Sequence, residues 1–96
     1  MSQSPPQVCR KTVKIQNKLG LHARPAMAFV DLAGRYKSTL TIRKQGQTVD
    51  GKSIMQMMML AATQGTELEI EASGPDAEKM VADLEDLVNR RFDEDG

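Results

Sequence analysis

The sequence contains very few cysteine and aromatic residues, and each shortage argues against a class of protein. Cys9 is the single cysteine, so the chain can form no internal disulfide and has no cysteine cluster for zinc or for iron and sulfur. One tyrosine, two phenylalanines and no tryptophan leave no aromatic surface on which bases could stack. The thirteen basic and thirteen acidic side chains cancel, which argues against nucleic-acid binding through bulk charge. We therefore expect no nucleic-acid partner, and the single cysteine suits a reducing cytoplasm.

Long hydrophobic segments are also missing. The longest apolar run, residues 54–62, has about half the length that a bilayer span requires, and Gln56 interrupts it. Residues 1–7 are polar and include two prolines, so we expect a short flexible leader over residues 1–9 rather than a secretory signal. These features predict a cytoplasmic protein that does not insert into a membrane.

The chain length of 96 residues and the hydrophobic content of 40% suit one domain with its own core. We expect that domain over residues 10–92, followed by an acidic tail, 93–96, that frays. Alternation of apolar and polar residues predicts four strands, and apolar residues at helical spacing predict three helices. The predicted strands are 10–16, 39–43, 47–49 and 67–72, and the predicted helices are 23–36, 54–62 and 75–91.

Three of the four predicted strands present one polar face of threonine, lysine or glutamate. A sheet with one polar face is covered by helices on the other face only. The order strand, helix, strand, strand, helix, strand, helix therefore predicts an α+β domain. We expect two layers and a largely antiparallel sheet that is solvated on its outer face.

The single histidine lies in the segment Gly20-Leu21-His22-Ala23-Arg24-Pro25. A lone histidine is commonly only a packing or surface residue, but here Pro25 fits only in the first turn of a helix, so that helix must begin close to His22. Free amides at the helix start and the guanidinium of Arg24 both suit a phosphoryl group. The positive end of the helix dipole favours a neutral, nucleophilic imidazole. Because the sequence has no magnesium site and no Walker lysine loop, the phosphoryl group would arrive already activated on another protein.

Ser53 precedes the second predicted helix, and serine is among the preferred N-cap residues.

In that helix Met55, Met57, Met58 and Met59 cannot all face the core, so some of them must be exposed. Exposed methionine forms an adaptable surface for different partners.

Three segments together resemble a known family. They are Gly20-Leu21-His22-Ala23-Arg24-Pro25-Ala26, Lys52-Ser53-Ile54-Met55 with the methionines that follow, and Ala72-Ser73-Gly74-Pro75. The chain resembles, over about residues 11–91, the histidine-containing phosphocarrier proteins HPr and NPr of the bacterial phosphoenolpyruvate-dependent phosphotransferase system. The resemblance implies an open-faced α+β sandwich in which His22 takes a phosphoryl group on Nδ1 from enzyme I and passes it to an EIIA-type domain. Arg24 would steady the phosphoryl group.

The same resemblance implies further properties. The protein would be a stoichiometric carrier rather than an enzyme, would need no cofactor or metal, and is expected to be a monomer. An HPr serine kinase/phosphorylase would act on Ser53, although this serine can also be simply a helix cap. The partner surface would comprise Ala23, Arg24, Met27, Ile54, Met55 and Met58.

Two alternatives stay open at this point. The chain could instead be a regulatory protein-binding module that is controlled by phosphorylation of Ser53 and has little carrier role. The branch is open as well, because Lys52-Ser53-Ile54-Met55 resembles the sugar-transport type. In contrast, Asn17-Lys18-Leu19-Gly20, Met59-Leu60-Ala61 and Phe92-Asp93-Glu94-Asp95 resemble the nitrogen-related type.

Overall fold

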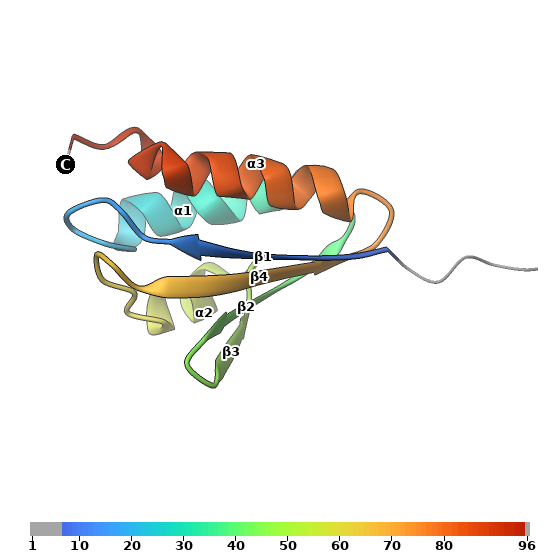
Figure 1. Ribbon diagram of the computed structural model, residues 1–96, viewed down its shortest axis with the longest axis horizontal. Coiled ribbons are helices and arrows are strands. Elements are labelled where there is room, and N and C mark those ends of the chain that lie inside the picture. The colour runs from blue at the N-terminus through green and yellow to red at the C-terminus, as the bar shows by residue number, and fades with distance from the viewer. Residues whose placement is uncertain (1–6, 96) are drawn as a thin grey trace, which may run out of the picture.

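The computed structural model describes residues 7–95, which form one four-stranded sheet and the helices that cover it (Figure 1). The elements follow the predicted order. They are β1 (Val8–Lys14), α1 (Ala23–Ala33), β2 (Thr39–Lys44), β3 (Gln47–Asp50), α2 (Ile54–Met59), β4 (Glu67–Ser73), α3 (Ala77–Asn89) and a short 3₁₀ turn, η1 (Arg91–Asp93). The strands are arranged in the order β1-β4-β2-β3, and every neighbouring pair is antiparallel.

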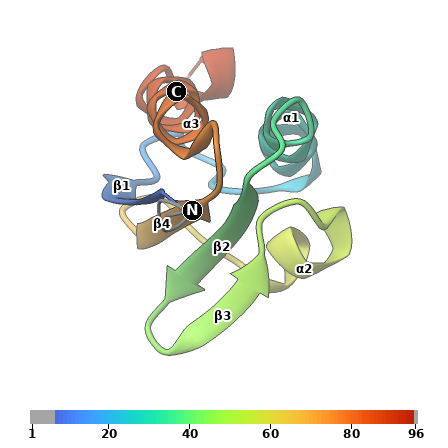
Figure 2. The ribbon, with the colours of Figure 1, turned by 90° about the vertical axis from the view of Figure 1, so that its right-hand side faces the viewer.

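All three α-helices lie on one face of this sheet, and the other face is open (Figure 2). The alternation in β4 explains this, because Leu68, Ile70 and Ala72 are buried under the helices. The glutamates between them lie on the open face, where Glu71 pairs with Arg10 at 2.6 Å and with Arg43 at 3.1 Å. The predicted two-layer α+β architecture, with an antiparallel sheet and three helices on one face, is therefore confirmed.

The core lies between the sheet and the buried sides of α1 and α3. Phe29 of α1 and Leu84 of α3 are fully buried there. The six-residue α2 buries only Met57, so most of its surface remains available to a partner. No helix in the described part of the chain is long and apolar enough to cross a bilayer.

The third helix begins later than the sequence predicts. Pro75 lies before the helix rather than in its first turn, and Asp76 is the N-cap of α3. The physical reason is a contact that is distant in sequence. The Asp76 carboxylate accepts hydrogen bonds from the backbone amides of Lys37 and Ser38, both at 2.9 Å, and from the Ser38 hydroxyl at 2.6 Å.

The first two helices are shorter than predicted. The first ends at Ala33 with Gly34 as its C-cap, and the second ends at Met59 because Ala61 has a left-handed φ of 49°. Leu60 and Ala62 still reach the core, from the loop that follows α2.

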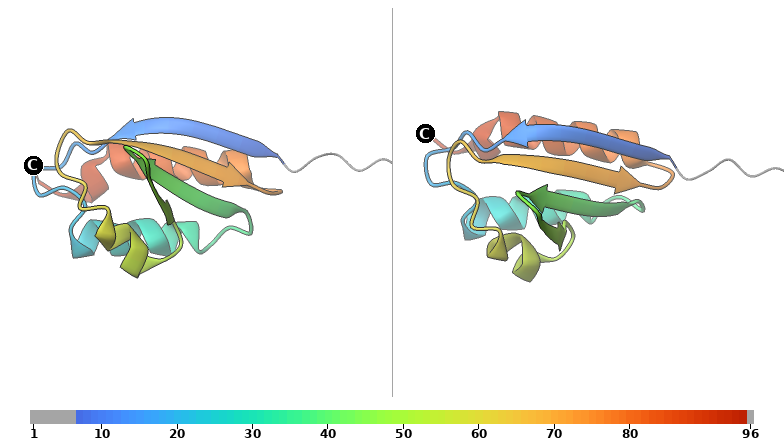
Figure 3. Two further views of the ribbon diagram at one scale, coloured as in Figure 1. Left: turned by 90° about the horizontal axis from the view of Figure 1, so that it is seen from below. Right: turned by 60° about the horizontal axis from the view of Figure 1, so that its bottom comes forward.

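The two ends of the described chain also differ from expectation. Val8 and Cys9, expected in the leader, pair with Ser73 and Ala72 of β4; residues 1–6 of that leader and Gly96 of the expected acidic tail lie outside the described residues. The last described segment continues beyond the end of α3 and lies at the same end of the molecule as the β1–α1 loop (Figure 3). Glu94, expected to fray, there lies 2.8 Å from His22.

Candidate functional site: the start of α1

His22 is the N-cap residue of α1. Its backbone is extended and its carbonyl accepts the first helical hydrogen bond, from the Ala26 amide at 3.0 Å. Pro25 lies in the first turn, as predicted, and supplies no donor. Within residues 7–95 no acceptor is found for the amides of Ala23 and Arg24, so these donors can meet an anion at the helix start.

The loop before His22 is held by a close backbone approach. The Leu21 amide donates to the Ala62 carbonyl at 2.8 Å, which joins the β1–α1 loop to the α2–β4 loop. Gly20 has a φ of +69°, and a Cβ at this position would lie 2.5 Å from the Ala62 oxygen. Only glycine fits this conformation and spacing without strain, so Gly20 contributes to the placement of the histidine.

The imidazole of His22 does not cap its own helix but contacts the C-terminal segment. Its Nε2 lies 2.8 Å from Oε2 of Glu94, and the side chain of His22 is 37% exposed. The other carboxylate oxygen of Glu94 accepts from Nδ2 of the buried Asn17 at 2.9 Å. The ring is therefore held at one nitrogen while remaining open to solvent.

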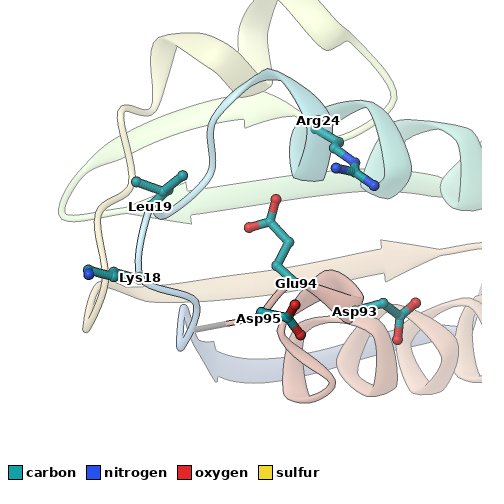
Figure 4. Close-up of a pocket in the computed structure, with 6 residues that line it drawn as sticks. All are labelled: Lys18, Leu19, Arg24, Asp93, Glu94 and Asp95. Atoms are coloured by element: carbon teal, nitrogen blue, oxygen red, sulfur yellow. The ribbon is translucent and has the colours of Figure 1, made fainter.

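Arg24 lines an open hollow of about 500 Å³ between the start of α1 and the C-terminal segment (Figure 4). The hollow is lined by Lys18, Leu19, Arg24, Asp93, Glu94 and Asp95. Figure 4 shows the Glu94 side chain pointing from the C-terminal segment towards the start of α1. Arg24 forms no ion pair with another described residue, so its guanidinium can bind an incoming anion.

Ser53 is the N-cap of α2, as the sequence predicts. Its Oγ accepts a hydrogen bond from the Gln56 amide at 3.2 Å, and the residue is partly exposed. Its position at the surface leaves the hydroxyl accessible, and the cap role alone also accounts for a serine here.

The predicted partner residues divide by exposure. Ala23, Arg24, Met27, Met55 and Met58 are exposed, whereas Ile54 packs partly against the core. Helices α1 and α2 lie next to each other on the same side of the sheet (Figure 2). Met59 and Leu19 are also exposed and were not among the predicted partner residues.

Comparison with known proteins identifies the family. The family model described as "PTS HPr component phosphorylation site" matches residues 9–90. The chain belongs to the HPr family. It is 44% identical over 85 residues to the phosphocarrier protein HPr of Neisseria meningitidis (88% of this chain, 96% of the relative). It is 39% identical over 87 residues to the phosphocarrier protein NPr of Klebsiella oxytoca (90% and 97%).

A solved structure agrees with this assignment. HPr of Thermoanaerobacter tengcongensis superposes with a TM-score of 0.89 at 39% identity, over 92% of this chain and 99% of that one. As a member of the HPr family, the protein is a phosphocarrier of the bacterial phosphotransferase system. HPr proteins are phosphocarriers rather than catalysts.

Two residues of this HPr site were not predicted from sequence, namely Glu94 and Asn17. The sequence did contain a signal, because both belong to segments that resemble the nitrogen-related type. Glu94 contacts both Asn17 and His22, and each of these contacts joins positions more than 70 residues apart. Among the described residues no group of three or more histidine, cysteine, aspartate or glutamate side chains could hold a metal ion.

Proposed function

We propose that His22 accepts a phosphoryl group on Nδ1 from phospho-enzyme I and transfers it to an EIIA-type domain. The observation that carries this proposal is the position of His22, a partly exposed imidazole at the start of α1. Two open amides follow it in the chain, and the guanidinium of Arg24, two residues later, lines the hollow at the same helix start. In a phosphocarrier family this combination provides both a nucleophile and an anion site.

Each group at the site has a defined task in this proposal. The lone pair of Nδ1 attacks phosphorus while the N–P bond of the donor histidine breaks, and the electron pair of that bond returns to the donor ring. Arg24 and the amides of Ala23 and Arg24 bind the phosphoryl oxygens. A carrier must also release the group, so the modest number of contacts is an advantage, because tighter binding would slow onward transfer.

We further propose that both partners dock on one surface formed by the starts of α1 and α2. It comprises the predicted residues Ala23, Arg24, Met27, Ile54, Met55 and Met58. The flexible thioether side chains can pack against structurally different partners, and Met55 is 76% exposed. The exposed Leu19 and Met59 extend this apolar surface. We expect the monomeric protein to act in the cytoplasm.

Ser53 supports a second, regulatory role. It begins the helix that carries Met55 and Met58, so a phosphate placed there by an HPr serine kinase/phosphorylase would change the docking surface directly. A dianion at a helix start gains amide contacts without unfolding the helix. In the alternative function this regulation would be the main role and phosphoryl transfer by His22 would be minor.

The carrier role is tested by intact mass measurement after incubation with enzyme I and phosphoenolpyruvate. We expect one added phosphoryl group that brief acid treatment removes, and we expect none on a His22→Ala variant. A Ser53→Ala variant is the matched control and should be labelled like the wild type. Labelling that survives in His22→Ala, or no labelling by several enzyme I preparations, would contradict the carrier role and favour the regulatory module.

A further inference from the structure

The contact between Glu94 and His22 is not explained by phosphoryl binding. Glu94 is a carboxylate beside a site that must receive an anion, yet its side chain is only 18% exposed and both of its oxygens are engaged. A carboxylate held in this position needs partners that fix it there.

Asn17 determines which oxygen of the Glu94 carboxylate faces His22. Its Nδ2 donates to the Gly20 carbonyl at 2.6 Å and to Oε1 of Glu94 at 2.9 Å. A carbonyl accepts only, so the nitrogen of the Asn17 amide must face Gly20. Oε2 of Glu94 is left to face Nε2 of His22 at 2.8 Å. An ionised carboxylate has no hydrogen to donate, so the hydrogen of this bond is on Nε2 and the lone pair of the neutral ring is on Nδ1.

The backbone that delivers Glu94 is under strain. Arg91, Phe92 and Asp93 have left-handed φ angles of 58°, 54° and 60°. Three consecutive non-glycine residues in this region are costly and persist only where the surrounding structure holds them. Phe92 is buried in the core, and the contacts of Glu94 hold the other end of the turn. The segment is thus fixed at both ends in the conformation that brings the carboxylate to the histidine.

We propose that Glu94 is a positioning residue that fixes the tautomer of His22 and presents the Nδ1 lone pair for phosphoryl transfer. This role rests on the proposed function of His22. When Nδ1 forms its bond to phosphorus, the Nε2 hydrogen stays on the ring, which becomes a cation. The Glu94 carboxylate then faces the developing positive charge, as the aspartate of a Ser-His-Asp triad faces its histidine.

The tautomer is tested directly by ¹H–¹⁵N correlation spectra of the imidazole, at a pH where the ring is neutral. The chain has one histidine, so the ring signals need no further assignment. We expect the wild type to carry its hydrogen on Nε2. In Glu94→Gln, Asn17 still requires an oxygen, which turns the new amide nitrogen towards His22 and makes Nε2 the acceptor. We expect the tautomer to reverse in this variant and to become mixed in Glu94→Ala.

Asp95→Asn is the matched control, because it removes one negative charge from the same segment but no hydrogen bond to His22. It should keep the wild-type tautomer. For the same variants we also measure the rate of phosphorylation by enzyme I, and we expect it to fall about tenfold in Glu94→Gln. One charge-assisted hydrogen bond can change the ratio of the two tautomers by about this factor.

The possible results separate this proposal from the proposed function. If the wild type is phosphorylated but its tautomer is the same in all variants, Glu94 does not position the ring and the carrier role stands. If the tautomer reverses but the rate of phosphorylation is unchanged, the positioning role is likewise overturned. If the wild type is not phosphorylated at all, the proposed function fails, and the role of Glu94 in transfer, which rests on it, fails with it.

Discussion

At the scale of single residues, the charge that a phosphate would add at Ser53 can be imitated without removing the cap of α2. Asparagine and aspartate are both good N-cap residues, so Ser53→Asp and Ser53→Asn differ from each other only in charge. We expect Ser53→Asp to lower kcat/KM for phosphoryl transfer from enzyme I about tenfold, mainly through a higher KM. The reason is the hypothesis that enzyme I docks through an acidic face, which added negative charge at this position would repel. Steady-state transfer kinetics provide the measurement. Equal kinetics of the two variants would show that charge at this position does not control docking.

The residues of the site differ in how far the sequence could reveal them. The positions of His22, Arg24 and Ser53 follow from local rules, because Pro25 fixes the start of one helix and Ser53 caps another. Glu94 could not be found in this way. Acidic residues at a chain end ordinarily fray, and only the packing of Phe92 and the amide of Asn17, distant in sequence, bring this one to the histidine.

At the scale of elements, the approach of the β1–α1 loop to the α2–β4 loop predicts a cost for any side chain at Gly20. Both Gly20 and Gly46 have left-handed φ angles, +69° and +83°, but only at Gly20 would a Cβ meet other atoms, at 2.5 Å. We expect Gly46→Ala to lower the free energy of unfolding by about 1 kcal/mol, the cost of the backbone conformation alone. Gly20→Ala should lower it by about 3 kcal/mol, because the loops must also separate.

Urea unfolding of the two variants compares these effects directly. We also expect Gly20→Ala to slow the phosphorylation of His22, because the displaced loop carries the start of α1. Equal losses of stability in both variants would mean that the two loops adjust to a methyl group without strain.

The elements themselves were largely predictable, and their ends were not. Residues that face the core are apolar, so the alternation in β4 and the apolar stripe of α3 can be seen in the sequence. The end of α2 depends on Ala61, whose left-handed conformation lets Leu60 and Ala62 reach the core. The start of α3 depends on Asp76, whose partners lie in another loop.

At the scale of the whole molecule, the sequence predicted the layers but not the order of the strands. Polar faces indicate which side of a sheet is open, whereas the placement of β4 between β1 and β2 depends on connections that periodicity does not describe. Asp76 is one residue that stabilises the arrangement of the elements. It joins the start of α3 to the segment that leads into β2, and Ser38 in that segment is fully buried.

The hydroxyl of Ser38 and the amides of Lys37 and Ser38 lower the pKa of Asp76 from its ordinary value of 3.8 to about 2. Because the pKa is lower in the folded state, the ionised carboxylate contributes stability at any pH above 3.8, and this contribution is lost as the pH falls towards 2. We expect Asp76→Asn to be less stable than the wild type at pH 7, because the amide offers one acceptor oxygen in place of two. The difference between the two proteins should then narrow between pH 4 and pH 2.

Urea unfolding at several pH values measures this difference, and carboxylates that titrate alike in both proteins cancel from it. One such group is Glu71, whose pKa is lowered by hydrogen bonds from Arg10 and Arg43. The control is Asp31→Asn, since Asp31 is exposed on α1 and forms no hydrogen bond with its side chain among the described residues. Its difference from the wild type should not change over the same range. If the Asp76→Asn difference is equally constant, the carboxylate does not hold the start of α3 to the segment before β2, and buried Ser38 must be stabilised by its packing alone.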